Sequence, residues 1–257
     1  MNQVAAVVEK TVKEFLRDKM EIFWTFAVPL FFLIVFPLIF YVDAPEEVIS
    51  NFKGGLTLTM VAFLIMTAGQ ANLPGSIASD KGRGLYLKMT SMPIKPWKEA
   101  FGRVLAVWIF SSIGAILVLL VGLIYGAKLS CGLIPALESL GFVLITCFAS
   151  VGIGLAIASF IKGESAATHT GVAITLLTYF LGGMVAPYSS LPTLLQTFAR
   201  IHPICSANAS IVFLLVGEDF VGYNPLNTGQ ICFTMMASLL IFTVGFALYS
   251  KFCWRKK

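Results

Sequence analysis

Residues 101–125 read FGRVLAVWIFSSIGAILVLLVGLIY, a stretch with no charged side chain after Arg103. An α-helix rises about 1.5 Å per residue, so about 20 apolar residues cross the roughly 30 Å of hydrocarbon in a bilayer. Stretches of this kind recur along the whole chain. The predicted transmembrane helices are residues 22–42, 54–77, 101–125, 134–161, 168–187 and 230–250.

The composition of the whole chain agrees with these spans. Of 257 residues, 58% are hydrophobic and 12% are charged, whereas charged residues make up about a quarter of a soluble domain. The mean hydropathy is +0.87. A soluble chain of this length could not bury so much apolar surface in one core. We therefore predict an all-α polytopic membrane protein, with residues 1–257 forming a single transmembrane domain of six helices.

The basic residues are distributed unequally between the two sides of these spans. Of the 18 Lys and Arg, all but Lys53, Lys128 and Arg200 fall at the chain ends, between the second and third spans, or in the turn after the fourth. Cytoplasmic segments carry the excess of basic residues, which predicts both termini in the cytoplasm of a multi-pass cell-membrane protein. The net charge of +5 thus reflects topology and does not indicate nucleic-acid binding.

Residues 1–21 have the periodicity of an amphipathic helix. Val4, Val8 and Val12 follow one another at i, i+4 spacing on one face, and charged residues cover the other. We predict an interfacial helix that lies along the inner membrane surface. The alternative is an ordinary charged segment leading into the first span.

Residues 79–98 form the longest predicted inner segment. The run from Asp80 to Gly84 interrupts the preceding span, and Pro93 follows the apolar residues 85–89. We expect residues 85–89 to form a short helix, whose exposed apolar side chains would suit contact with a cytoplasmic partner. The alternative is a solvated basic loop that serves only topology.

Residues 188–227 fall on the outer side and are too apolar for a free loop. The run 209–217 is about half as long as a membrane crossing requires, and Pro192 and Pro203 interrupt the region upstream. We predict a pair of short re-entrant helices before the last span. Irregular backbone at that depth has to be surrounded by protein or a water-filled cavity.

Three features together resemble the permease subunit of ATP-binding-cassette (ABC) exporters of the type-2 permease family. The first is the amphipathic N-terminal helix before a proline-bearing first span. The second is IASDKGRGLYLKMTSMPI at residues 77–94, followed by Gly102-Arg103. The third is LGGMVAPYSSLPTLLQ at residues 181–196, followed by His202-Pro203 where the family more often has Asn-Pro. The resemblance extends over almost the full chain.

The resemblance implies a division of labour between subunits. Two permeases, either two copies of this chain or this chain and a paralogue, would form a dimer around a pathway through the membrane lipid. The segment after the second span would be a coupling helix that docks on a separate ATPase (nucleotide-binding) subunit. Its docking residues would be Asp80, Gly84, Leu85, Leu87 and Met89. The outer re-entrant turn would include Pro187, Pro192, His202 and Pro203.

The chain contains no Gly-Lys dipeptide. A Walker A loop needs that pair to hold nucleotide phosphates. We therefore expect no cofactor and no ATP hydrolysis by this chain, so that it is not itself an enzyme. The energy for transport would come from the partner ATPase.

A few polar residues are candidates for a site within the membrane. Gln70 and Asn72 lie in the inner half of the second span, where they would either hydrogen-bond to a neighbouring helix or meet a substrate from the cytoplasm or inner leaflet. Ser165 and His169 have i, i+4 helical spacing, and Glu164 is adjacent; an intramembrane hydrolase would need such a nucleophile and base on a preorganised site. They fall in a tight inner turn without a glycine-flanked nucleophile, so we expect a helix cap.

The five cysteines show no metal-binding pattern. Cys131 and Cys205 both fall on the predicted outer side, which leaves a disulfide between them open. The other three lie in or at the end of predicted spans, where cysteine behaves as a small apolar side chain.

The predicted function is ATP-driven export, or lateral release, of an amphipathic substrate such as a drug, a lipid or a lipid-linked glycan. An apolar lining suits such molecules better than small ions. A non-transporting membrane scaffold or assembly factor is an alternative, and stimulation of ATP hydrolysis by a substrate would distinguish it from a transporter. An intramembrane enzyme is a further alternative, which would need clustered ionisable residues at bilayer depth.

Overall fold

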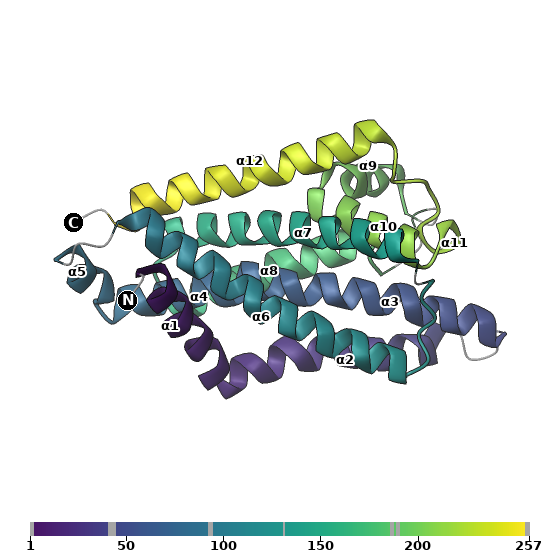
Figure 1. Ribbon diagram of the computed structural model, residues 1–257, viewed down its shortest axis with the longest axis horizontal. Helices are drawn as coiled ribbons and strands as arrows, with labels where there is room; N and C mark the ends of the chain where they lie inside the picture. Colours follow the sequence, from purple (N-terminus) through teal and green to yellow (C-terminus); the bar gives the residue numbers. More distant parts are fainter. Residues whose placement is uncertain are drawn as a thin grey trace.

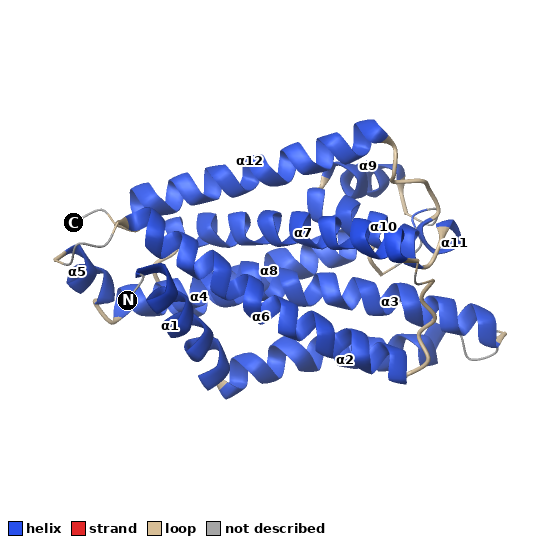
Figure 2. Ribbon diagram, in the orientation of Figure 1, coloured by secondary structure: helices blue, strands red, loops and turns tan. Residues whose placement is uncertain are grey.

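The computed structural model describes residues 3–40, 45–91, 95–130, 132–185, 188 and 191–254. Within these ranges every regular element is a helix, and no strand is present (Figure 2). In this described part, five helices are long and apolar enough to cross a membrane, or six if a bent helix pair counts as one span. The chain is an all-α polytopic membrane protein, as predicted.

The long helices run along the length of the molecule, with α5 at one end and α9 to α11 at the other (Figure 1). In chain order the helices are α1 (Gln3–Arg17), α2 (Lys19–Phe40), α3 (Glu46–Thr67), the π-helix η1 (Ala68–Asn72), α4 (Leu73–Gly82), α5 (Leu85–Thr90), α6 (Pro96–Ile124), α7 (Leu133–Phe160), α8 (Glu164–Leu181), α9 (Thr193–Ile201), α10 (Pro203–Leu215), α11 (Glu218–Val221) and α12 (Thr228–Phe252).

The five spanning helices match the first, second, third, fourth and sixth predicted spans. The second is longer than predicted because α3, η1 and α4 form one continuous unit over Glu46–Gly82. The predicted fifth span, 168–187, overlaps α8, which begins at Glu164 and ends at Leu181; Pro187 lies outside the described residues. The 18 residues of α8 rise about 27 Å, near the lower limit for a crossing.

A π-helical turn interrupts the second span at Ala68–Asn72. Pro74 follows it, and a proline has no N–H to donate to the carbonyl four residues earlier. That carbonyl, of Gln70, packs against Gly171 of α8, where a Cβ atom would lie only 1.8 Å from the oxygen. The Gly69 carbonyl packs in the same way against Gly154 of α7. The irregular turn is therefore held by two glycine contacts with neighbouring helices.

Burial separates a central helix unit from peripheral ones. In the most apolar part of Glu46–Gly82, 72% of the residues are buried inside the molecule, compared with 22% in α2 and 17% in α12. The exposed apolar side chains of α2 and α12, such as Phe31 and Leu240, are suited to lipid or to another membrane subunit. The second span is thus the core around which the bundle packs.

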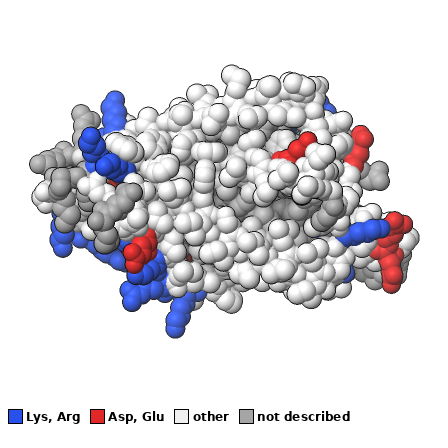
Figure 3. Space-filling view, in the orientation of Figure 1, with Lys and Arg blue, Asp and Glu red and all other residues white. Residues whose placement is uncertain are grey.

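Charged side chains gather at the two ends of the molecule and leave the middle apolar (Figure 3). Lys and Arg dominate the end that carries α1 and α5, whereas acidic residues are prominent at the opposite end. Helix α1 covers most of the predicted amphipathic segment 1–21 and packs along α6. Gly102 allows this approach, since a Cβ atom there would lie 2.7 Å from Val7.

Candidate functional site

The segment after the second span turns sharply into a short helix at the end of the bundle. Gly84 has a φ of 71°, a left-handed conformation that glycine adopts without steric cost, and it separates α4 from α5. Helix α5 spans Leu85–Thr90, close to the predicted 85–89; residues 92–94 of the same loop lie outside the described ranges. The loop predicted as 79–98 thus contains a defined helix, and its first residues extend α4.

The two faces of α5 differ in their surroundings. Leu87 is 71% exposed, and Lys88 is exposed beside it. Tyr86 and Met89 are buried against the bundle, and Leu85 is half-buried. Of the predicted docking residues, Leu87 therefore presents the most surface, whereas Met89 is an anchor for the helix.

Next to α5 lies a hydrogen-bonded group of three buried charged residues, two buried tyrosines and the half-buried Lys10. It is here called the ion cluster and comprises Lys10, Asp80, Tyr86, Glu99, Arg103 and Tyr249. The Arg103 guanidinium is 1% exposed and donates to the carboxylates of both Asp80 and Glu99. Lys10 Nζ lies 2.6 Å from Asp80 Oδ2. A buried charge is very costly unless it is paired and hydrogen-bonded, and here each carboxylate has a cationic partner.

Two tyrosines join α5 and the last helix to the ion cluster. Tyr249 of α12 donates to Glu99, and Tyr86 of α5 hydrogen-bonds to Tyr249 and, over 3.3 Å, to Glu99. Burial raises the pKa of the Tyr86 phenol well above its ordinary value, so it stays a neutral donor. The ion cluster therefore links α5 to α1, α4, α6 and α12.

Asp80 lies within this cluster, and sequence reasoning missed its partners. It is 3% exposed and bonded to Arg103 and Lys10, so it supports α5 from beneath and is not presented at the surface. The sequence pattern predicted Arg103 only as part of the opening of the third span, and it gave no prediction for Glu99. Their i, i+4 spacing at the start of an apolar run was the available signal.

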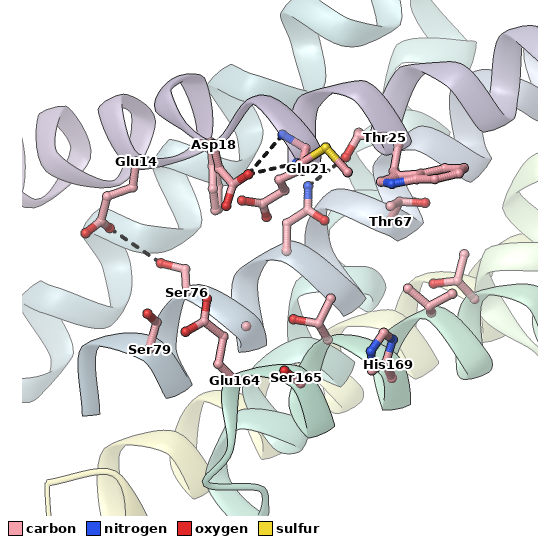
Figure 4. Close-up of a pocket in the computed structure, with 18 of the residues that line it drawn as sticks. Glu14, Asp18, Glu21, Thr25, Thr67, Ser76, Ser79, Glu164, Ser165 and His169 are labelled. Carbon is pink, nitrogen blue, oxygen red and sulfur yellow. Dashed lines mark hydrogen bonds between the residues drawn. The ribbon is translucent and has the colours of Figure 1, made fainter. Parts of the chain in front are cut away.

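A cavity of about 920 Å³ opens on the other side of α4, between α1–α2 and α8 (Figure 4). Acidic side chains line the cavity near α1 and the start of α8, and apolar side chains line its other end. The acidic lining residues are Glu14, Asp18, Glu21 and Glu164. The apolar ones include Trp24, Val28, Phe63, Val172 and Leu176.

Asn72 and Gln70, the two amide residues predicted as candidates for a site in the membrane, have different positions relative to this cavity. Asn72 lines it and donates from Nδ2 to Thr25 Oγ1 over 3.0 Å, between the second and first spans. Gln70 is fully buried behind the wall and accepts a hydrogen bond from Thr175 Oγ1 over 3.2 Å. Both amides therefore make helix–helix hydrogen bonds, and only Asn72 also faces the cavity.

Glu164, Ser165 and His169 line the cavity from the start of α8. The prediction that they cap this helix is wrong, because its N-cap residue is Gly163 and no side chain makes a capping hydrogen bond there. In the described part of the chain no hydrogen bond joins Ser165 to His169, so they do not form a nucleophile–base pair. Ser76 of α4 connects the cavity to the ion cluster. Its hydroxyl accepts from Arg103 over 3.2 Å and lies 3.5 Å from a Glu14 carboxylate oxygen (Figure 4).

Two short helices, α9 and α10, lie at the end of the molecule opposite α5 (Figure 1). Helices α9 and α10 meet at 88° at His202, with Pro192 before α9 and Pro203 opening α10. The His202 ring lies 3.4 Å from Cys205, which is a buried free thiol and forms no disulfide. Cys131, the other cysteine for which a disulfide was left open, lies outside the described residues.

Taken together, the helices define a multi-pass membrane protein with a cavity at its basic end and a short surface helix beside it. The family model for the ABC-2 type transporter membrane domain matches residues 2–216. The chain therefore belongs to this family and is a permease component of an ABC transporter, a role that implies partnership with an ABC ATPase subunit. No curated protein matches the chain significantly.

Proposed function

We propose that this permease exports an amphipathic substrate from the cytoplasm or inner leaflet, driven by ATP hydrolysis in a separate subunit docked on α5. In this arrangement the basic end, with α1, α5 and both termini, faces the cytoplasm of a cell membrane. Residues 1–257 act as one transmembrane domain, in which α8 is the fifth span and α9–α10 are the outer re-entrant pair.

The observation that carries this proposal is a continuous hydrogen-bonded connection between α5 and the cavity. It runs from Tyr86 through Glu99 and Arg103 to Ser76, which adjoins Glu14 in the cavity wall. A movement of α5 is transmitted to α4 and α6 because the buried charges cannot separate without a large energetic cost. A movement of α5 driven by ATP hydrolysis in the docked subunit would thereby change the shape of the cavity.

A second copy of the chain, or a paralogue, would complete the pathway. The cavity opens between α2 and α8, where Trp24 is 58% exposed and Val172 is also exposed. Apolar side chains such as Phe31 and Leu177 continue this face on both helices. Two such faces brought together in the bilayer would enclose the two cavities, while lipid covers the rest. Alternating access then follows from rigid movement of the two halves.

Co-purification from the native membrane tests the proposed coupling surface. Leu87→Asp should abolish recovery of the ATPase subunit, because it places a charge in the apolar contact. Leu194→Asp on α9, where the leucine is 80% exposed at the opposite end of the molecule, is the matched control and should retain it. An ATPase that stays bound to Leu87→Asp would contradict docking on α5. If wild type brings down no ATPase, the scaffold alternative replaces the exporter.

A further inference from the structure

The cavity lining changes from polar to apolar in the same direction along α2, α8 and the second span. On α2 it passes from Glu21 through Thr25 to Val28, and on α8 from Glu164 through His169 to Leu176. The second span supplies Ser79 and Ser76 at the inner end, then Asn72, and finally Phe63 at depth. The site is therefore built for a molecule with a polar head toward the cytoplasm and an apolar body toward the membrane centre.

The side chains that line the inner end of the cavity carry a net negative charge, although this end lies in the most basic region of the protein. Four carboxylates line the cavity against two guanidiniums, those of Arg17 and Arg83. Glu14 is paired with Lys10 at 2.9 Å, and Asp18 caps α2 by accepting backbone N–H groups of residues 20 and 21. Among the residues that the structure describes, Glu21 and Glu164 make no ion pair.

Glu21 and Glu164 approach the cavity from opposite walls, α2 and α8 (Figure 4). The Glu21 carboxylate is costly to bury, and the negative charges of Asp18, Glu164 and Glu14 repel it as well. A cation placed between them would remove this repulsion and gain attraction in a partly desolvated site. Trp24 also lines the cavity, and an aromatic ring attracts a cation that lies over its face.

Given the exporter role proposed above, we infer that the cavity selects amphipathic cations, such as a lipophilic amine or an onium ion. The cationic head lies between Glu21 and Glu164, and the apolar body extends toward Phe63 and Leu176. A volume of about 920 Å³ accommodates a drug-sized molecule. The unpaired carboxylates repel anionic lipids of the same size from this position. Uncharged lipids of that size gain no electrostatic attraction there.

The test compares two probes with the same shape and opposite charge, tetraphenylphosphonium and tetraphenylborate. Binding of each radiolabelled ion is measured by equilibrium dialysis on the complex in lipid nanodiscs, with the signal from empty nanodiscs subtracted. We expect saturable binding of the phosphonium ion at least tenfold tighter than that of the borate. The double variant Glu21→Gln plus Glu164→Gln should lose about tenfold in phosphonium affinity while keeping its elution profile.

Glu138→Gln on α7 is the matched control, since Glu138 is exposed and lies outside the cavity. It should bind the phosphonium ion as wild type does. The inference is overturned if the borate binds as tightly as the phosphonium ion, if neither ion binds, or if the double variant binds like wild type. These results are independent of ATPase co-purification, so failure of the cation preference is distinguishable from failure of the exporter role.

Discussion

The cytoplasmic end of this permease, as we orient it, contains two groups of charged residues that differ in whether the charges have partners. In the ion cluster, Asp80 and Glu99 are buried and each is bonded to Arg103. In the cavity, Glu21 and Glu164 face each other across open space without an ion pair in the described structure. Helix α4 separates the two groups and contributes to both.

This difference assigns the two groups different roles. A fully paired buried cluster costs a great deal to open, so it holds helices in fixed relation. Unpaired carboxylates lining a cavity do not stabilise the fold, and like charges at close range destabilise it. Arrangements of this second kind are characteristic of binding sites. In the exporter that we propose, the ion cluster would transmit movement and the cavity would receive the ligand.

The largest expected effect on stability comes from removing Arg103, the central cation of the ion cluster. Arg103→Met would leave Asp80 and Glu99 buried without their shared partner, which costs about 3–5 kcal/mol. Thermal unfolding of the purified protein should show a large drop in Tm or loss of the monodisperse species. Lys95→Met, at an exposed position just before the same helix, should change stability by less than about 0.5 kcal/mol. Equal Tm values for the two variants would contradict the assigned role of Arg103.

A smaller effect is expected where α8 packs on the π-helical turn behind the cavity. In Gly171→Ala the new Cβ atom would lie 1.8 Å from the Gln70 carbonyl oxygen, so the helices have to separate at a cost of about 1–3 kcal/mol. Gly141→Ala on α7 is the control, because its Cβ meets nothing within 4 Å. There the substitution should leave stability unchanged or raise it. A Gly171→Ala protein as stable as Gly141→Ala would show that the turn tolerates displacement.

The link between α5 and the ion cluster should matter more for coupling than for stability. Tyr86→Phe removes one hydroxyl that bonds to Glu99 and Tyr249, which costs about 1 kcal/mol. We expect ATP hydrolysis by the complex to continue with reduced stimulation by substrate. Tyr125→Phe, which removes a hydroxyl at a half-buried position outside the cluster, should leave stimulation unchanged. Unchanged stimulation in Tyr86→Phe would rule out transmission through this tyrosine.

Hydropathy and charge distribution were sufficient to predict the fold class and the approximate positions of the long helices. Both depend on local composition, since an apolar run of sufficient length has few alternatives to a membrane helix. The continuity of α3, η1 and α4 could not be predicted in this way. Pro74 would usually indicate a break, and only the packing of Gly154 and Gly171 against the π-helical turn shows how the helix continues.

The candidate site was less accessible to sequence reasoning because its residues come from distant parts of the chain. Asp80 was predicted to dock a partner, but its pairing with Arg103 depends on how α4 and α6 pack. Glu164 and His169 were read as a local cap, and their position in a cavity wall depends on the placement of α8 opposite α2. Sequence spacing reveals neighbours on one helix, and it does not reveal which helices face each other.

The smallest expected effect has the opposite sign and is the sharpest test of the comparison. Glu21→Gln removes a carboxylate that is costly to bury and that Asp18, Glu164 and Glu14 repel, so it should raise stability by about 0.5 kcal/mol. Glu99→Gln, the same substitution in the ion cluster, removes a partner of Arg103 and should lower stability by several kcal/mol.

Both changes convert a glutamate to glutamine at the same end of the protein, so effects of side-chain size and membrane depth largely cancel between them. Thermal unfolding of the two variants beside wild type gives the comparison directly. Changes in Tm of opposite sign would mean that the Glu21 charge destabilises the protein without ligand and is balanced only when a ligand binds. If Glu21→Gln instead lowers Tm as Glu99→Gln does, Glu21 has a structural partner, and the cavity and the ion cluster are parts of one buried network.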